Sequence, residues 1–195
     1  MNELPLIDFV IISHNHYDHL DRRSVLALAK QQREKPPCFL VPLGLKRWFE
    51  DIGISQNMIE LDWWQSEKIG QLSFTAVPVQ HWSKRGLFDT NKTLWAGWVV
   101  LSPQNLFFAR DTGYSKDFAE TGRRYSHIDL SLIPIGANSP RWFISDMHVN
   151  PEEAVKIYLD VKNRQSIGMH WGTFVNLTKE SLLEPPKRLL QELEK

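Results

Sequence analysis

The chain has 195 residues, and its 23 basic and 23 acidic side chains cancel. This length is enough for one hydrophobic core, so we expect a single domain over residues 1–195. The balanced charge argues against binding to nucleic acid, whose phosphate backbone attracts basic proteins.

The single cysteine, Cys38, excludes a disulfide framework and a zinc site made of thiolates. An intracellular, reducing compartment fits this composition best. No apolar run reaches the roughly 20 residues that a membrane span needs, and the first residues lack the pattern of a signal peptide. We therefore expect a cytoplasmic protein that at most lies on a membrane surface.

Runs of apolar, β-branched or aromatic residues predict strands, and segments with helical periodicity lie between several of them. This mixture indicates an α/β (α+β) layered domain. The predicted strands are 7–12, 38–41, 58–61, 72–79, 94–101, 106–109, 130–135 and 166–169, and the predicted helices are 22–32, 45–51, 115–125, 151–163 and 186–194.

The helix 151–163 has the clearest start signal. Asn150 can cap it, Pro151 suits its first position, and Glu152 and Glu153 complement the helix dipole. Its periodicity predicts a buried stripe formed by Ala154, Val155, Tyr158 and Val161.

Four potential metal ligands follow the first predicted strand directly: His14, His16, Asp18 and His19. Neutral imidazole and carboxylate oxygen are preferred ligands of zinc and its neighbours when thiolates are absent. In an extended chain His14, His16 and Asp18 share one face, whereas His19 points elsewhere, so one loop can serve two ions. The alternative is a polar turn rich in histidine, but four such groups after a buried strand would carry a large desolvation cost.

Further ligand types stand where other predicted strands end, at His81, Asp111 and His170. Seven ligands suit two ions, roughly 3.5 to 4 Å apart, if one carboxylate bridges them. Such a pair activates water and clamps the oxygens of a displacement at phosphorus, so we predict a hydrolase. Zinc is the expected metal, although this ligand set also accepts iron, manganese or nickel.

The ligand pattern resembles the dinuclear site of the metallo-β-lactamase superfamily. The likeness extends to the N-acylphosphatidylethanolamine-hydrolysing phospholipase D family and runs from about residue 6 to the C-terminus. The segments that carry it are 12–21, 41–45, 60–64, 80–82, 111–114, 133–137, 140–143, 148–155 and 170–174.

The resemblance implies an αββα sandwich and two zinc ions with Asp111 as the bridging ligand. It also implies that hydroxide attacks the phosphodiester of a phospholipid, which releases an N-acylethanolamine and phosphatidic acid. The implied ligands are His14, His16 and His81 for one ion, and Asp18, His19 and His170 for the other.

Two residues near the ligands have open roles. His148 either satisfies the start of helix 151–163 or, as the family match favours, lies near the substrate phosphate as a catalytic and substrate-binding residue. Tyr17 either lines the substrate cavity or packs against the fold. Together with Asp18 and Asp111, His148 is a predicted catalytic residue.

Two departures from the family pattern affect these expectations. Only residues 1–12 precede the metal loop, where family members carry further strands. We therefore expect an open sheet edge and an uncovered face, which a second copy of the chain or a longer gene product would cover. Arg110 stands where the family usually has glycine, and either the fold tolerates it or it impairs metal binding.

Two other functions remain open at this point: a soluble hydrolase of the lactonase type, and a truncated, catalytically silent relative. We also expect the tryptophans to be mostly core residues, with some lining an acyl-chain groove and two, Trp82 and Trp171, beside the ligands. The tryptophans considered are Trp63, Trp64, Trp82, Trp95, Trp98, Trp142 and Trp171.

Overall fold

The computed structural model describes residues 4–32, 34–173 and 178–195, and its strands form two sheets. The smaller sheet is parallel and has the order β1 (Phe9–Ile11), β2 (Cys38–Pro42) and β3 (Met58–Leu61). The larger sheet runs from β4 to β9 in sequence order, antiparallel as far as β7 and parallel from β7 to β9. Its strands are β4 (Ser66–Ile69), β5 (Leu72–Val77), β6 (Gly97–Leu101), β7 (Leu106–Phe108), β8 (Leu130–Pro134) and β9 (Gln165–Met169).

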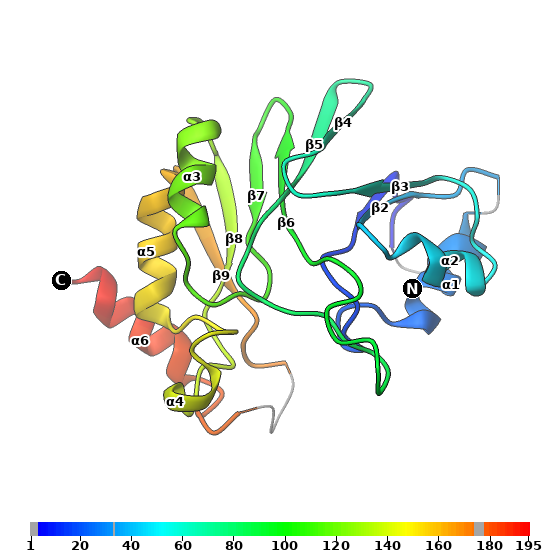
Figure 1. Cartoon of the computed structure of the whole chain (residues 1–195). Coiled ribbons are helices and arrows are strands. Elements are labelled where there is room, and N and C mark those ends of the chain that lie inside the picture. Colours follow the sequence, from blue (N-terminus) through cyan, green and yellow to red (C-terminus); the bar gives the residue numbers. More distant parts are fainter. Residues whose placement is uncertain (1–3, 33, 174–177) are drawn as a thin grey trace.

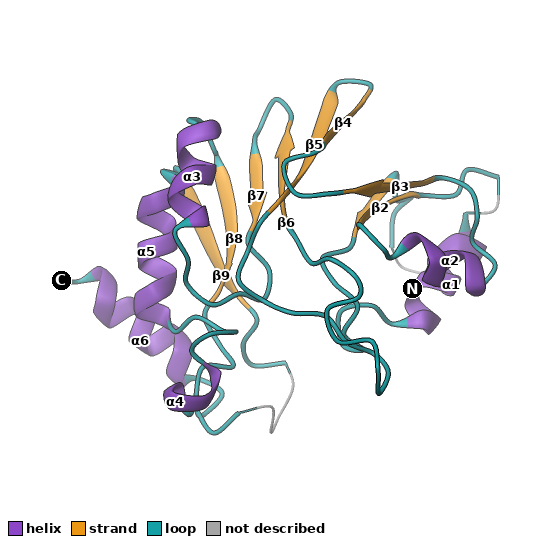
Figure 2. Ribbon diagram, viewed as in Figure 1, coloured by secondary structure: helices purple, strands orange, loops and turns teal. Residues whose placement is uncertain are grey.

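The helices lie outside the two sheets (Figures 1 and 2). On one side are α1 and α2, beside the smaller sheet, and on the other are α3, α5 and α6, beside the larger sheet. The helix bounds are α1 (Arg22–Gln31), α2 (Lys46–Asp51), α3 (Asp117–Arg124), α4 (Arg141–Ile144), α5 (Pro151–Val161) and α6 (Glu184–Leu193).

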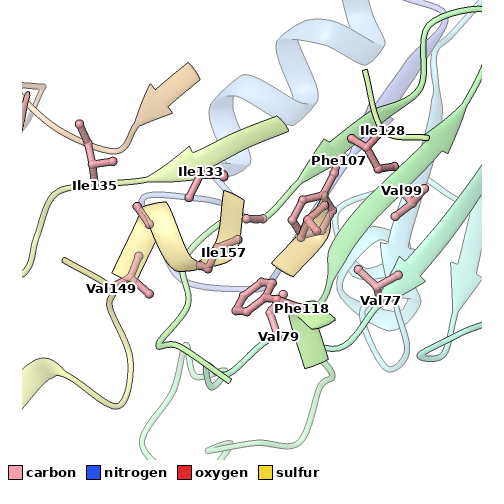
Figure 3. Packing of buried hydrophobic residues seen from close by; sticks show 13 residues of the cluster. Val77, Val79, Val99, Phe107, Phe118, Ile128, Ile133, Ile135, Val149 and Ile157 are labelled. Atoms are coloured by element: carbon pink, nitrogen blue, oxygen red, sulfur yellow. The ribbon is translucent and has the colours of Figure 1, made fainter. Parts of the chain in front are cut away.

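Three apolar clusters correspond to the three interfaces between these layers. In β2, Phe39 and Val41 pack with residues of α1 and α2, whereas Leu40 between them packs with Trp98 of the larger sheet. This alternation follows from the two-residue period of a strand. The third cluster, which includes Phe107, joins the larger sheet to α3 and α5 (Figure 3). The predicted αββα sandwich is confirmed.

The capping signal of α5 is confirmed. The Asn150 side chain accepts a hydrogen bond from the Glu153 backbone N–H (2.9 Å), and the Glu153 carboxylate accepts one from the Asn150 N–H (3.2 Å). The predicted stripe is only partly right, because Val155 and Tyr158 are half-buried and Ile157 is fully buried. The buried face is therefore rotated towards Ile157, which joins the cluster between the sheet and the helices.

Three elements differ from the sequence-based expectation. The strand β4 was not expected because its polar, charged sequence lacks an apolar run; it pairs with β5 in a hairpin. The four-residue α4 is too short for a periodic signal. The strand β6 starts at Gly97, since the residues before it bond to loops: the Leu94 N–H donates to the Leu43 carbonyl (2.7 Å) and the Ala96 N–H to the Ser13 carbonyl (2.9 Å).

An apolar face remains partly open towards β9. Trp98 pairs in register with Phe108, Phe108 with Leu132, and Leu132 with Ile167, so these side chains share the face that packs on the smaller sheet. Trp98 is fully buried, whereas Ile167 is 55% exposed. Among the described strands, none pairs with the outer edge of β1. The expected open edge and uncovered face are both present.

The tryptophans are less buried than expected. Trp98 is fully buried, but Trp142 of α4 is 86% exposed, so the core assignment is wrong for Trp142. It lies on a helix of one turn that offers no second face to bury. Within the described residues, no helix combines the length and apolar character that crossing a bilayer requires.

Candidate metal centre

The loop after β1 is fixed by contacts from the segment that follows β5. The Arg85 guanidinium donates to the carbonyls of Asn15 (2.9 Å) and Leu20 (2.7 Å), and the Lys84 N–H donates to the Asn15 side chain (2.8 Å). Trp98 of β6 donates to the Ile12 carbonyl (2.9 Å). The start of the histidine loop is thereby held by the larger sheet, and the rest of the loop by the segment that follows β5.

The first group of ligand atoms comes from His14, His16 and His81, all within 4.8 Å of one another. His14 Nε2 lies 2.6 Å from His16 Nδ1. The Met147 carbonyl, 3.1 Å from His81 Nδ1, orients that ring and leaves Nε2 facing the group. Burial lowers the pKa of His81 to about 2 and also lowers the pKa of His16, so both rings are neutral and able to bind a metal at neutral pH.

The second group is built around Asp111, which follows β7. Its Oδ2 lies 3.0 Å from His19 Nε2, and its Oδ1 lies 3.0 Å from Nε2 of His170, which follows β9. Burial opposes the charge of Asp111, but Arg110 and His19 hold its pKa well below the usual range. One ionised carboxylate thus faces two imidazoles with separate oxygens.

Asp18 lies at the rim of the second group. Its Oδ2 is 3.4 Å from His19 Nε2, and 41% of its side chain is exposed. The hydrogen bond to His19 lowers the pKa of Asp18 to about 2, so it is a carboxylate at neutral pH. Burial works against a charge on His19, but the bonds from Asp111 and Asp18 outweigh it and raise the pKa of His19.

His148 is closer to the centre than its sequence position indicated. Its ring centroid lies 5.4 Å from that of His81 and 5.7 Å from that of His170, and it forms a third group with Asp111 and His170. Burial lowers the pKa of His148 to about 4, and within the described residues its buried Nδ1 has no hydrogen-bond partner. Sequence reasoning did not count His148 among the ligands, because only the fold of the α4 loop brings it here.

Tyr17 lies on the outer side of the histidine loop and is 67% exposed. Its hydroxyl donates to the Arg85 carbonyl (3.1 Å), and the Arg85 guanidinium carbon lies 4.1 Å from its ring centroid. The ring therefore packs on Arg85, and a role in binding substrate stays a prediction.

Arg110 points into the centre. Its backbone has φ 59°, and its side chain is 1% exposed. Its Nη2 lies 2.5 Å from His14 Nδ1 and 3.8 Å from Asp111 Oδ2. Burial lowers the pKa of Arg110 to about 10, so this residue places a permanent positive charge beside the first group at neutral pH.

The residues present fit a transition-metal centre. Neutral imidazoles and ionised carboxylates are the donors that zinc and iron bind. His16 Nε2 and His81 Nε2 are buried and, in the described part of the chain, have no hydrogen-bond partner. Buried polar atoms are rarely left so, and a divalent ion would satisfy both.

The model of the family described as "Beta-lactamase superfamily domain" matches residues 1–171. The chain belongs to the beta-lactamase superfamily. Solved structures with this superfamily's fold agree, and their sequence identity to the chain is low enough that they show the fold alone. CmlA, a diiron beta-hydroxylase from Streptomyces venezuelae, superimposes with a TM-score of 0.72 at 17% identity, over 99% of this chain and 43% of CmlA. The metallo-beta-lactamase fold protein YhfI from Bacillus subtilis gives a TM-score of 0.65 at 16% identity, over 96% of this chain and 70% of YhfI.

Among superfamily members, the chain is similar to N-acyl-phosphatidylethanolamine-hydrolyzing phospholipase D 1 of Caenorhabditis elegans, with 40% identity over 97% of this chain and 55% of that protein. It is 39% identical to the mitochondrial N-acyl-phosphatidylethanolamine-hydrolyzing phospholipase D of Saccharomyces cerevisiae, over 97% of this chain and 41% of that protein. The chain thus spans about half the length of these curated relatives.

Proposed function

We propose that the chain is a metal-dependent hydrolase of phosphodiesters, and that its substrate class is the N-acylphosphatidylethanolamine type of phospholipid. The observation that carries the proposal is the position of Asp111, whose two oxygens face His19 and His170 at 3.0 Å beside a second group of three histidines. Similarity to two phospholipases D that act on this lipid supports the substrate class.

We assign the ligand roles that the family resemblance implies. His14, His16 and His81 would hold one ion, Asp18, His19 and His170 the other, and Asp111 both. Bound there, two zinc ions or other divalent ions would supply a bridging hydroxide as nucleophile and stabilise charge on the phosphate. The low pKa of Asp111 and the neutral state of His81 keep these ligands ready for metal at neutral pH.

The remaining polar groups position water and substrate. Asp18 is ionised and partly exposed, so its carboxylate can accept a proton or hydrogen bond from the attacking water. His148 is neutral at pH 7, and its buried Nδ1 has no hydrogen-bond partner among the described residues, so we assign it a hydrogen bond to the substrate phosphate. We also assign Tyr17 to the outer edge of this substrate region.

Exposed apolar side chains on two segments that contact the centre favour a lipid over a soluble substrate. Leu87 and Phe88 are 83% and 86% exposed and belong to the segment that is bonded to the histidine loop through Arg85. Trp142 and Phe143 of α4 are 86% and 75% exposed. Apolar and aromatic groups of this kind insert into the boundary region of a bilayer, so we include peripheral membrane contact in the proposal.

Arg141 links α4 to the centre. Its guanidinium donates to the His148 carbonyl (2.6 Å) and pairs with Glu153 of α5 (2.7 Å). The exposed aromatic pair is therefore tied to the residue that we place at the substrate phosphate. A lipid held by α4 would present its headgroup at this point.

The proposal is tested by supplying the zinc-loaded protein with three substrates: vesicles containing N-acylphosphatidylethanolamine, a soluble diaryl phosphodiester and a lactone. We expect N-acylethanolamine and phosphatidic acid from the vesicles, loss of that activity in Asp111→Asn, and unchanged activity in Asp51→Asn, an exposed carboxylate on α2. Turnover of the soluble diester alone would reject the lipid substrate, and turnover of the lactone alone would favour a lactonase. Zinc binding without any turnover would favour a silent relative.

A further inference from the structure

Arg110 contacts a potential metal ligand at hydrogen-bond distance. Its Nη2 lies 2.5 Å from Nδ1 and 3.3 Å from Nε2 of His14. Because one nitrogen lies close to both ring nitrogens, the guanidinium sits over the His14 ring and not along the lone pair of either nitrogen. A cation that is 1% exposed is thereby held against a potential metal ligand.

The contact between two rings links His14 to the rest of the first group. His14 Nε2 lies 2.6 Å from His16 Nδ1, and ligand atoms of His14, His16 and His81 lie within 4.8 Å of one another. The charge of Arg110 therefore acts on the whole group.

This charge conflicts with metal binding by the first group. Its ligands are neutral imidazoles, so the group holds no negative charge that offsets the guanidinium. The guanidinium repels a divalent ion, and burial weakens the screening of that repulsion. The first group can therefore take a metal tightly only if the Arg110 side chain leaves His14.

In the second group, the ionised carboxylates of Asp111 and Asp18 offset the guanidinium charge. Arg110 Nη2 is 3.8 Å from Asp111 Oδ2, too far for a hydrogen bond, and Asp111 Oδ1 faces His170. His19 likewise approaches Asp111, at 3.0 Å. Positive charge near an ionised carboxylate also helps to keep that ligand deprotonated.

Arg110 also carries two structural costs. Its φ of 59° lies in the left-handed region, where a side chain is strained and glycine is favoured. Its Nε and Nη1 are buried and, among the described residues, have no hydrogen-bond partner. Strain and an incompletely paired buried cation at one residue mark a functional position.

We infer that Arg110 makes the two metal sites unequal: His19, Asp111 and His170 take the first ion tightly, whereas the group around His14 takes a second ion only after Arg110 is displaced. The inference rests on the metal centre of the proposed function and adds an order of filling to it. It identifies Arg110 as a positioning residue that acts through His14.

The test is a calorimetric zinc titration of the metal-free protein, with metal per chain measured by mass spectrometry after desalting. For the wild type we expect one tight equivalent and a second that is weaker by on the order of 100-fold, because the buried guanidinium charge opposes the second ion. Arg110→Gly and Arg110→Ala should each bind two tight equivalents. Arg47→Ala, which removes an exposed arginine on α2, should titrate like the wild type.

Two ligand variants check which site is filled first. His14→Ala should keep the tight equivalent and lose the weak one, whereas His170→Ala should lose the tight one. If Arg110→Gly fails to fold, Arg110→Ala and the histidine pair still decide the question.

Three results would overturn the inference, and they separate it from the proposed function. Two tight equivalents in the wild type, with zinc-dependent turnover, would reject the role of Arg110 and keep the proposed function. A weak second equivalent that persists in both Arg110 variants would do the same. No zinc bound by any variant would reject the metal centre, and the proposed function with it.

Discussion

At the scale of single residues, the centre combines the neutral imidazoles of His81 and His148 with the ionised carboxylates of Asp111 and Asp18. Burial lowers the pKa of His81 to about 2 and of His148 to about 4, while Arg110 and His19 hold the pKa of Asp111 well below its usual value. These shifts prepare the donors for metal, but they also make the metal-free fold sensitive to acid.

We predict that the metal-free protein loses stability as the pH falls from 6.5 towards 4. Unfolded histidines take up protons below about 6.5, whereas folded His81 and His148 remain neutral, so the unfolded state binds more protons and gains stability in this window. Each such histidine contributes a slope of up to about 1.4 kcal/mol per pH unit.

Urea unfolding at a series of pH values measures this slope. The variant His148→Gln should reduce this slope by the equivalent of up to one bound proton. The variant His127→Gln, which changes an exposed histidine, should leave the slope unchanged. An equal slope in the wild type and in His148→Gln would contradict the buried neutral state of His148.

The residue types and spacing of the histidine loop were enough to predict a cluster of possible metal ligands, because few other uses fit so many imidazoles and carboxylates together. The direction of Arg110 could not be predicted, since it depends on a backbone φ of 59° that the sequence does not encode for arginine. The packing of His148 was also beyond prediction. It depends on the contact of His148 N–H with the Ile144 carbonyl in a helix of one turn.

At the scale of elements, the site depends on the ends of β7 and β9 and on the crossing of α3 with α5. Asp111 follows β7 and His170 follows β9, and both strands flank β8 in a parallel arrangement that brings their ends to one edge. The helices α3 and α5 cover the other face of these strands. They approach closely where Gly122 of α3 meets the last turn of α5, so this crossing supports the strands that carry the ligands.

We predict that Gly122→Ala destabilises the protein by about 1–3 kcal/mol, the usual effect of overpacking. A Cβ at position 122 would overlap the Asp160 carbonyl and lie 2.9 Å from Val161 Cα. In an exposed helix the same change would stabilise by about 1 kcal/mol. The sign of the change in the free energy of unfolding therefore decides whether Gly122 is in close contact with α5.

Chemical denaturation gives the free energy of unfolding of this variant. The control is Gly86→Ala, whose Cβ would lie at an ordinary 3.5 Å from the Asp89 carboxylate, and we expect little change. A stabilised Gly122→Ala protein would show that α3 and α5 are farther apart than described.

At the scale of the whole molecule, alternating helices and strands predicted a layered domain, and the resemblance supplied the two-sheet sandwich. The layer assignment of individual side chains followed from strand period, as in Phe39 and Leu40, which pack on opposite faces. The mostly exposed strand β4 and exposed Trp142 escaped prediction, because neither has a periodic apolar pattern or a covering layer. The apolar face that opens towards Ile167 keeps a second copy of the chain among the predicted partners.

The most direct test of the central claim is phosphodiester hydrolysis by the metal-free protein, with zinc added stepwise, in water labelled with the heavy isotope of oxygen. Mass spectrometry of both products shows which bond breaks. We predict that turnover appears only with zinc, that one labelled oxygen enters the phosphate product, and that none enters the released alcohol. Label in the alcohol, turnover without zinc, or no turnover at full zinc loading would contradict the account.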